Sequence, residues 1–122
     1  MPEVGGSINE KILTLPEEYA FENDFFGHVV DVSQDGNSVF VSAYGKSSAS
    51  MASFGAVYAF QKNSTTGEWD NIGAFLSDNP AANMQFGNAM RASRDGLVVA
   101  VGEKLNSIQT SNAGAVHIFL KD

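Results

Sequence analysis

The chain has no cysteine among its 122 residues, so disulfides and thiolate chemistry are excluded, and any bound metal would need oxygen or histidine ligands. Only seven basic residues stand against fourteen acidic ones, and the net charge of −7 disfavours nucleic acid and anionic lipid as partners. No apolar run approaches membrane-spanning length, and the amino terminus lacks the pattern of an export signal. The sequence therefore predicts neither nucleic-acid binding nor membrane insertion.

The residues that are present describe a globular chain of β-strands. Hydrophobic residues make up 43% and charged residues 17%, a balance typical of a folded domain. Twelve glycines against three prolines indicate many turns between short elements. We expect one folded unit without a cofactor over residues 11–122, preceded by a flexible lead-in over residues 1–10.

The chain repeats itself. Three landmarks recur in the same order, the first two after 60 residues and the third after 59, which indicates two copies of one unit. The landmark pairs are Phe26-Gly27 and Phe86-Gly87, Ser33-x-Asp35-Gly36 and Ser93-x-Asp95-Gly96, and Gly55-Ala56-Val57-Tyr58-Ala59-Phe60 and Gly114-Ala115-Val116-His117-Ile118-Phe119. The first repeat spans about residues 20–79 and the second about residues 80–122.

Each repeat predicts a series of short strands. Apolar runs and the Asp-Gly turn signals place first, second and third strands in both repeats, and a fourth strand after the hairpin of the first repeat. The expected ranges are 28–32, 38–43, 56–60 and 69–76 in the first repeat, and 88–92, 97–101 and 115–119 in the second. Residues 11–15 resemble the end of the fourth strand, so we expect an eighth strand there. The prediction is two four-stranded antiparallel sheets.

These motifs resemble the FG-GAP repeats of integrin-type β-propellers, and the likeness covers nearly all of residues 11–119. The resemblance implies two propeller blades, a role in adhesion, ligand binding or assembly, and a location on a cell or virion surface. It also implies structural roles for the repeated motif residues, with Phe26 and Phe86 wedged between blades. The motif residues are Phe26, Gly27, Asp35, Gly36, Gly55, Phe60, Phe86, Gly87, Asp95, Gly96, Gly114 and Phe119.

Two blades cannot close a propeller, because a ring takes about 4 to 8 of them. Uncovered strand edges would also invite aggregation. We therefore expect the chain to form a homo-oligomer in which residues 11–15 of one copy complete the last blade of the next. Two, three or four copies would give four, six or eight blades, and the six-bladed trimer is favoured, unless the chain is part of a longer propeller.

One short motif suggests a cation site. Asp31-x-Ser33-x-Asp35-Gly36 resembles the start of a calcium loop, in which alternating oxygen atoms surround a hard cation. The later ligand positions hold Val39 and Ser42, and a plain Asp-Gly turn is the competing interpretation.

Other polar features favour structural interpretations. Gly45-Lys46-Ser47 matches only the end of a phosphate-binding loop, because a strand precedes it where a glycine is required. The acidic stretch from Glu17 to Asp24 is read as a solvated loop. His28 and His117 lie in different strands without partners at ligand spacing, and no Ser, His and Asp set stands out. The sequence therefore predicts no enzyme.

Two aromatic residues are candidates for ligand binding. Trp69 could stack on a sugar, because a flat apolar ring with a polar group suits the face of a sugar, and Tyr44 could do the same. Packing against the blade is the alternative for both. We expect a non-enzymatic binding or adhesion module whose partner is a protein or glycan surface. The most specific form of this hypothesis is a lectin. The second hypothesis is a structural assembly protein, such as a decoration subunit on a virus particle.

Overall fold

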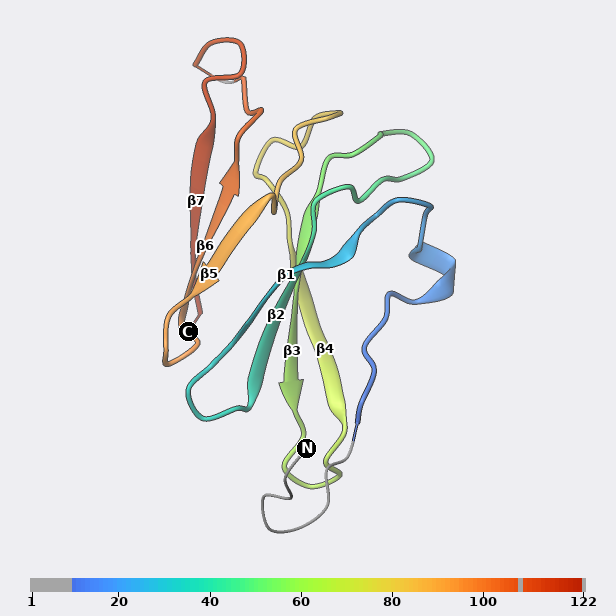
Figure 1. Cartoon of the computed structure of the whole chain (residues 1–122), viewed down its shortest axis with the longest axis vertical. Coiled ribbons are helices and arrows are strands. Elements are labelled where there is room, and N and C mark those ends of the chain that lie inside the picture. The colour runs from blue at the N-terminus through green and yellow to red at the C-terminus, as the bar shows by residue number, and fades with distance from the viewer. Residues whose placement is uncertain (1–9, 108, 122) are drawn as a thin grey trace, which may run out of the picture.

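The computed structural model describes residues 10–107 and 109–121 and confirms the all-β prediction. Figure 1 shows two antiparallel sheets side by side, a four-stranded one in the order β1-β2-β3-β4 and a three-stranded one in the order β5-β6-β7. A 3-10 turn, η1 (Glu17–Tyr19), precedes the first sheet. The strands are β1 (Phe26–Val32), β2 (Ser38–Ala43), β3 (Ala56–Lys62), β4 (Trp69–Phe75), β5 (Ala89–Ala92), β6 (Val98–Glu103) and β7 (Ala115–Leu120).

The Ser-x-Asp-Gly motifs build the same turn in both sheets. Ser33 Oγ donates to Asp35 Oδ1 at 2.6 Å, and Ser93 Oγ donates to Asp95 Oδ1 at the same distance. Each carboxylate also accepts the backbone N–H two residues on, at 3.0 Å. These hydrogen bonds favour the charged form, the serine contributing most, and hold the pKa of Asp35 and of Asp95 below the usual value. The motif is thus a self-contained turn between the first two strands of each sheet.

The internal repeat extends to the backbone of the loops. Residues in the left-handed region recur at equivalent positions even where the amino acid differs, so the two halves share a loop conformation as well as a strand pattern. The pairs are Asn23 and Asn83 (φ 66° and 64°), Phe25 and Gln85 (58° and 57°), Gly27 and Gly87 (99° and 94°), Gly36 and Gly96 (76° and 74°), Ser53 and Asn112 (48° and 54°), and Gly55 and Gly114 (84° and 86°).

The hydrophobic core lies between the two sheets. Phe86 is fully buried there, among Phe40 and Val57 of the first sheet and Val99 and Val101 of the second. Gly55 forms a parallel bridge with Phe86, and a Cβ atom on Gly55 would lie 2.0 Å from the Phe86 carbonyl oxygen. Only glycine permits this approach, so Gly55 and Phe86 together fix how the sheets meet.

The sheets converge at β1 and β5. Asp31 Oδ2 accepts the backbone N–H of Ala92 at 2.7 Å, and the Gln34 N–H donates to the Arg94 carbonyl at 2.7 Å. Toward β4 and β7 the sheets leave a cavity of about 340 Å³, which Phe75 and Phe119 line. The pair is therefore wedge-shaped, narrow at β1 and β5.

The expected eighth strand is absent, so the second sheet has three strands rather than four. Residues 11–15 form no strand, and among the described residues nothing pairs with the outer edge of β7. The physical reason is topological: this segment lies against the first sheet, where Leu15 lines a cavity with Tyr58 and Ala74, while the open edge belongs to the second sheet. Of the lead-in expected over residues 1–10, residues 1–9 lie outside the described part of the chain.

Candidate functional site

Three aromatic side chains, two exposed and one partly buried, form a cluster at the end of the first sheet where β1 begins and β2 ends. We call Phe25, His28 and Tyr44 the aromatic platform. The Phe25 and Tyr44 rings stack with centroids 5.2 Å apart and an angle of 12° between planes, and the His28 ring lies 4.4 Å from Tyr44. Phe25 is 50% exposed. The platform thus offers flat apolar surface beside a phenol and an imidazole, both able to hydrogen-bond.

A close contact between the loop before β1 and the loop after β2 holds the platform in place. The Gly45 N–H donates to the Asp24 carbonyl at 3.1 Å, and a Cβ atom on Gly45 would lie 2.2 Å from the Asn23 carbonyl oxygen and 2.8 Å from the Phe25 ring. Phe25 has a φ of 58°, a conformation that is costly for a bulky side chain. The backbone therefore holds Phe25 in a strained position against Tyr44.

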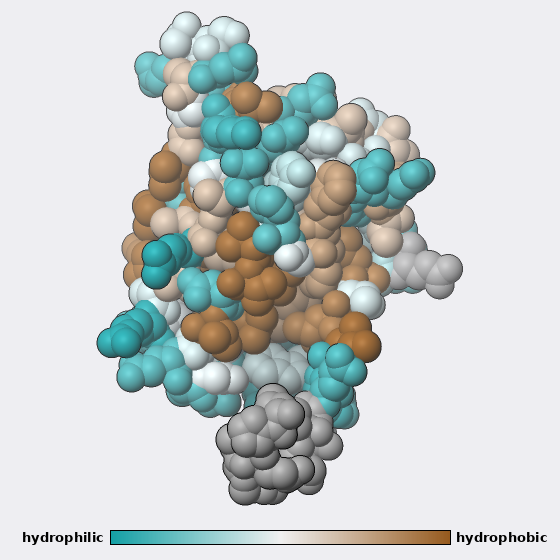
Figure 2. All heavy atoms as spheres, in the orientation of Figure 1, coloured by the Kyte–Doolittle hydropathy of each residue, from teal (hydrophilic) through white to brown (hydrophobic). Residues whose placement is uncertain are grey.

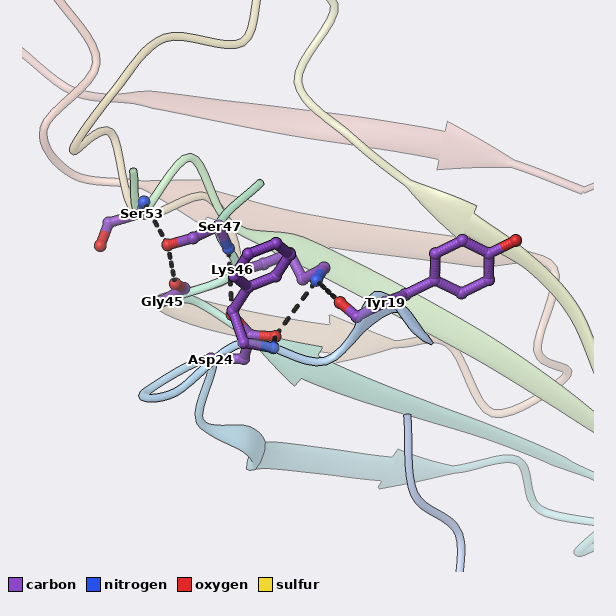
Figure 3. A network of polar contacts seen from close by, with 7 residues as sticks. Tyr19, Asp24, Gly45, Lys46, Ser47 and Ser53 are labelled. Carbon is purple, nitrogen blue, oxygen red and sulfur yellow. Dashed lines mark hydrogen bonds and ion pairs between the residues drawn. The ribbon is translucent and has the colours of Figure 1, made fainter. Parts of the chain in front are cut away.

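A buried ion pair lies next to the platform (Figure 3). Lys46 Nζ lies 3.1 Å from Asp24 Oδ2, with the two side chains 9% and 5% exposed, and it also donates to the Tyr19 carbonyl. The Asp24 carboxylate accepts two backbone N–H groups as well, those of Phe21 and Ser47, at 2.8 and 3.0 Å. The expectation of a solvated acidic stretch is therefore wrong at Asp24, which joins the loop before β1 to the loop after β2.

The second repeat lacks the platform. At positions equivalent to Phe25, His28 and Tyr44 it carries Gln85, Asn88 and Lys104. The backbone at the first two positions is nevertheless the same, since Gln85 has a φ of 57° and the Asn88 N–H donates to the Gln85 carbonyl as the His28 N–H does to Phe25, both at 3.1 Å. The following loop differs, because Leu105 stands where the first repeat has Gly45. Because this loop forms without aromatic residues, the fold does not require them in the first repeat.

Trp69 lies away from the platform. Trp69 pairs with Lys62, at the end of β3 that leads into the β3–β4 hairpin. Tyr44 lies at the opposite end of β3, because the preceding residue, Ala43, pairs with Ala56. Trp69 is partly buried. The two predicted ligand-binding residues therefore do not form one site, and Tyr44 alone belongs to the platform.

The side chains of the three calcium candidates form hydrogen bonds within the protein. Asp31 bonds to the β5 backbone, and Ser33 and Asp35 bond to each other inside the turn. Within residues 10–107 and 109–121, no three His, Asp or Glu side chains come together in a way that could hold a metal ion. The geometry favours the alternative interpretation, a plain Asp-Gly turn.

A second buried polar cluster lies in the second sheet. Glu103 is fully buried, and its Oε1 lies 2.9 Å from His117 Nε2 and accepts the side-chain amide of Asn106 at 2.7 Å. Among the described residues, no donor reaches Glu103 Oε2. Asn106 stands at the position of Lys46, so the two repeats fill the same place with different polar chemistry.

An apolar cavity of the first sheet lies under the residues before β1. This cavity of about 390 Å³ is bounded by Leu15, Tyr19, Phe21, Tyr58 and Leu76, among others. Burial raises the pKa of Tyr58 to about 12, and the Asp24 charge adds to the effect.

The Tyr58 phenol gives a test of this cavity. The unfolded chain loses the Tyr58 proton near pH 10 and the folded chain near pH 12, so folding stability should fall as the pH rises from 10 to 12. An ultraviolet titration of the folded protein should show a tyrosine phase near pH 12, and Tyr58→Phe should remove that phase. A titration of the folded protein without a phase near pH 12 would contradict the burial of Tyr58.

Comparison with known proteins adds no identification: no family model, no curated protein and no solved structure matches this chain. The structure itself, with its internal repeat and its aromatic platform, is therefore the basis of a functional proposal. Among the described residues, no helix is long and apolar enough to span a membrane.

Proposed function

We propose that this protein is a non-enzymatic binding module that takes the apolar face of a sugar ring on the platform of Phe25, His28 and Tyr44. The observation that carries the proposal is the contrast between the repeats: the loops before β1 and β5 share a backbone conformation, but the first repeat carries an aromatic cluster and the second carries Gln85, Asn88 and Lys104. Clustered exposed aromatics that the fold does not need are typical of binding surfaces.

The platform also has a favourable place for multivalent binding. His28 lies on β1, which contacts β5 where the two sheets converge. In a closed β-propeller of the FG-GAP type, built from several copies of this chain, the narrow side of each wedge faces the central axis. Copies of the platform would then gather at one end of the ring, and individually weak contacts would add through avidity.

The test is glycan-array screening followed by calorimetric titration of the best ligand. The informative variant replaces the platform with the residues of the second repeat, Phe25→Gln/His28→Asn/Tyr44→Lys, because the loop before β5 already carries Gln85 and Asn88 on the same backbone conformation. We expect it to fold and to lose at least about tenfold in affinity, as loss of an aromatic anchor usually causes.

Trp69→Ala provides the matched control, since it removes an aromatic residue at the other end of the sheet. We expect its affinity to equal that of the unaltered protein. A wild-type protein that binds no glycan, or a platform variant that binds as tightly as the original, would refute the proposal.

A second candidate function is that of a structural assembly subunit, for example one that decorates a virus particle. The exposed apolar side chains favour it. Val116, Ile118 and Leu120 are 69%, 58% and 75% exposed on β7, and Figure 2 shows hydrophobic side chains over the middle of the molecule and along the margin where β7 lies. Tight association with a larger particle in the absence of glycan binding would favour this second function over the first.

A further inference from the structure

The outward side of the second sheet is apolar but uncovered. It carries Ala100, Val116 and Ile118, which we call the outer face of the second sheet. Val116 and Ile118 are more than half exposed, which is unusual for β-branched side chains on neighbouring positions of one strand face. Within the described part of the chain, no segment covers this face.

The internal repeat shows what covers the same surface elsewhere. By position in the repeat, Ala100, Val116 and Ile118 correspond to Phe40, Val57 and Ala59 of the first sheet. Those three side chains are buried, at 3%, 0% and 3% exposure, because the second sheet packs on them. The interface between the two sheets of one chain therefore shows how a further sheet could cover the outer face of the second sheet.

The complementary surface is present on the far side of the first sheet. In the core, the covering side chains come from Phe86, Val99 and Phe119. Their equivalents are Phe26, Val39 and Phe60, which we call the outer face of the first sheet. Its rings adopt the same arrangement: Phe26 meets Phe60 edge-on at 6.1 Å, as Phe86 meets Phe119 at 6.0 Å.

The residues before β1 already hold the place of a fourth strand. Leu15 lies 60 residues before Phe75, whose ring stacks 4.8 Å from Phe119. Leu15 lines the cavity of about 390 Å³ over Tyr58 and, together with Phe26, a second cavity, so it lies over part of the outer face of the first sheet as Phe75 lies over the second sheet. Lys11 is tethered to that sheet by an exposed ion pair with Glu68, at 3.7 Å.

From these equivalences we infer that a second copy of this chain docks head to tail: its β5–β7 sheet packs on the outer face of the first sheet, and β7 pairs with residues 12–15. The register follows from β3 and β4, in which Val57 pairs with Phe75. Val116 of one copy therefore lies opposite Leu15 of the other, and Ile118 lies against Val39 and Phe60, as its equivalent Ala59 lies beside Val99 and Phe119 within one chain. The inference deepens the proposed function, because it supplies the contact from which the ring is built.

The contact joins different faces of two copies, so it repeats until it closes. Each copy adds two wedge-shaped blades, and three copies give the favoured six. The inference also explains why residues 11–15 form no strand in a single chain: their partner strand belongs to another copy.

The absence of native cysteine allows a direct test by disulfide trapping. Leu15 and Val116 lie on opposite sides of the two stacked sheets, so a bond between Leu15→Cys and Val116→Cys must join two molecules. Opposite residues of paired strands have the separation that a disulfide requires. We expect the oxidised double variant to give a covalent ladder that ends at three chains, and an equal mixture of the two single variants to give covalent dimers only.

Light scattering on cysteine-free protein complements the trapping. We expect a trimer for the original chain and a monomer for Ile118→Asp, whereas Thr65→Asp, with the same added charge at the tip of the β3–β4 hairpin, should remain a trimer. A monomer at high micromolar concentration, or an Ile118→Asp variant of unchanged mass, would overturn the inference. The platform variant should keep its mass while losing glycan, so failure of assembly and failure of the proposed function can be told apart.

Discussion

Replacing Phe86 with alanine is expected to lower the free energy of unfolding by about 3–5 kcal/mol, the usual cost of removing a fully buried phenylalanine. The ring has no exposed surface and lies edge-on to His117 and Phe119, at 5.1 and 6.0 Å between centroids. Its loss would leave a cavity between the two sheets, because Gly55 and the backbone of residue 86 are locked together and cannot collapse inward. Urea denaturation followed by tryptophan fluorescence measures the change.

The internal repeat provides the matched control, Phe26→Ala. Phe26 makes the equivalent ring contacts, with Tyr58 and Phe60, but it is only partly buried because no second sheet covers it within the chain. In the Ile118→Asp background, which removes assembly, Phe26→Ala should cost clearly less than Phe86→Ala. Equal losses in that background would mean that burial between the sheets is not what stabilises Phe86.

Most of the fold could be predicted from the sequence, because its repeated signals are local. The Ser-x-Asp-Gly turn and the apolar run 38–43 gave β2 its observed bounds. The errors lie where pairing decides the structure. Residues 11–15 have the pattern of a strand, but a strand needs a partner, and no local signal tells whether the open edge belongs to the same chain.

The candidate site was less predictable, because it depends on contacts between loops. The sequence predicts Tyr44 as a candidate for ligand binding. Phe25 and His28 join it only because Gly45 approaches Asn23 closely. One signal could have pointed to Phe25: comparing the two repeats position by position shows an aromatic residue where the second has glutamine. The prediction of a solvated loop is wrong at Asp24 for a related reason, because its partner Lys46 is distant in the sequence.

The pairing of Asp24 with Lys46 leads to the second large effect. Lys46→Met keeps most of the side-chain volume but leaves the Asp24 carboxylate buried without its counter-charge, a change that typically costs about 3–5 kcal/mol. The carboxylate retains the N–H groups of Phe21 and Ser47, so the loop before β1 should loosen rather than lose all its contacts. Urea denaturation measures the stability, and hydrogen exchange of residues 16–25 measures the loosening.

The double variant Asp24→Met/Lys46→Met separates the effect of an unpaired buried charge from the effect of losing the ion pair itself. Replacing both members of a buried ion pair with apolar side chains is often neutral, and the second repeat already carries Met84 at the position of Asp24. We therefore expect the double variant to recover most of the stability lost in Lys46→Met. Because the ion pair also joins the loops that carry Phe25 and Tyr44, the recovered protein should still bind glycan more weakly than the original. Full recovery of both properties would show that packing alone holds the platform.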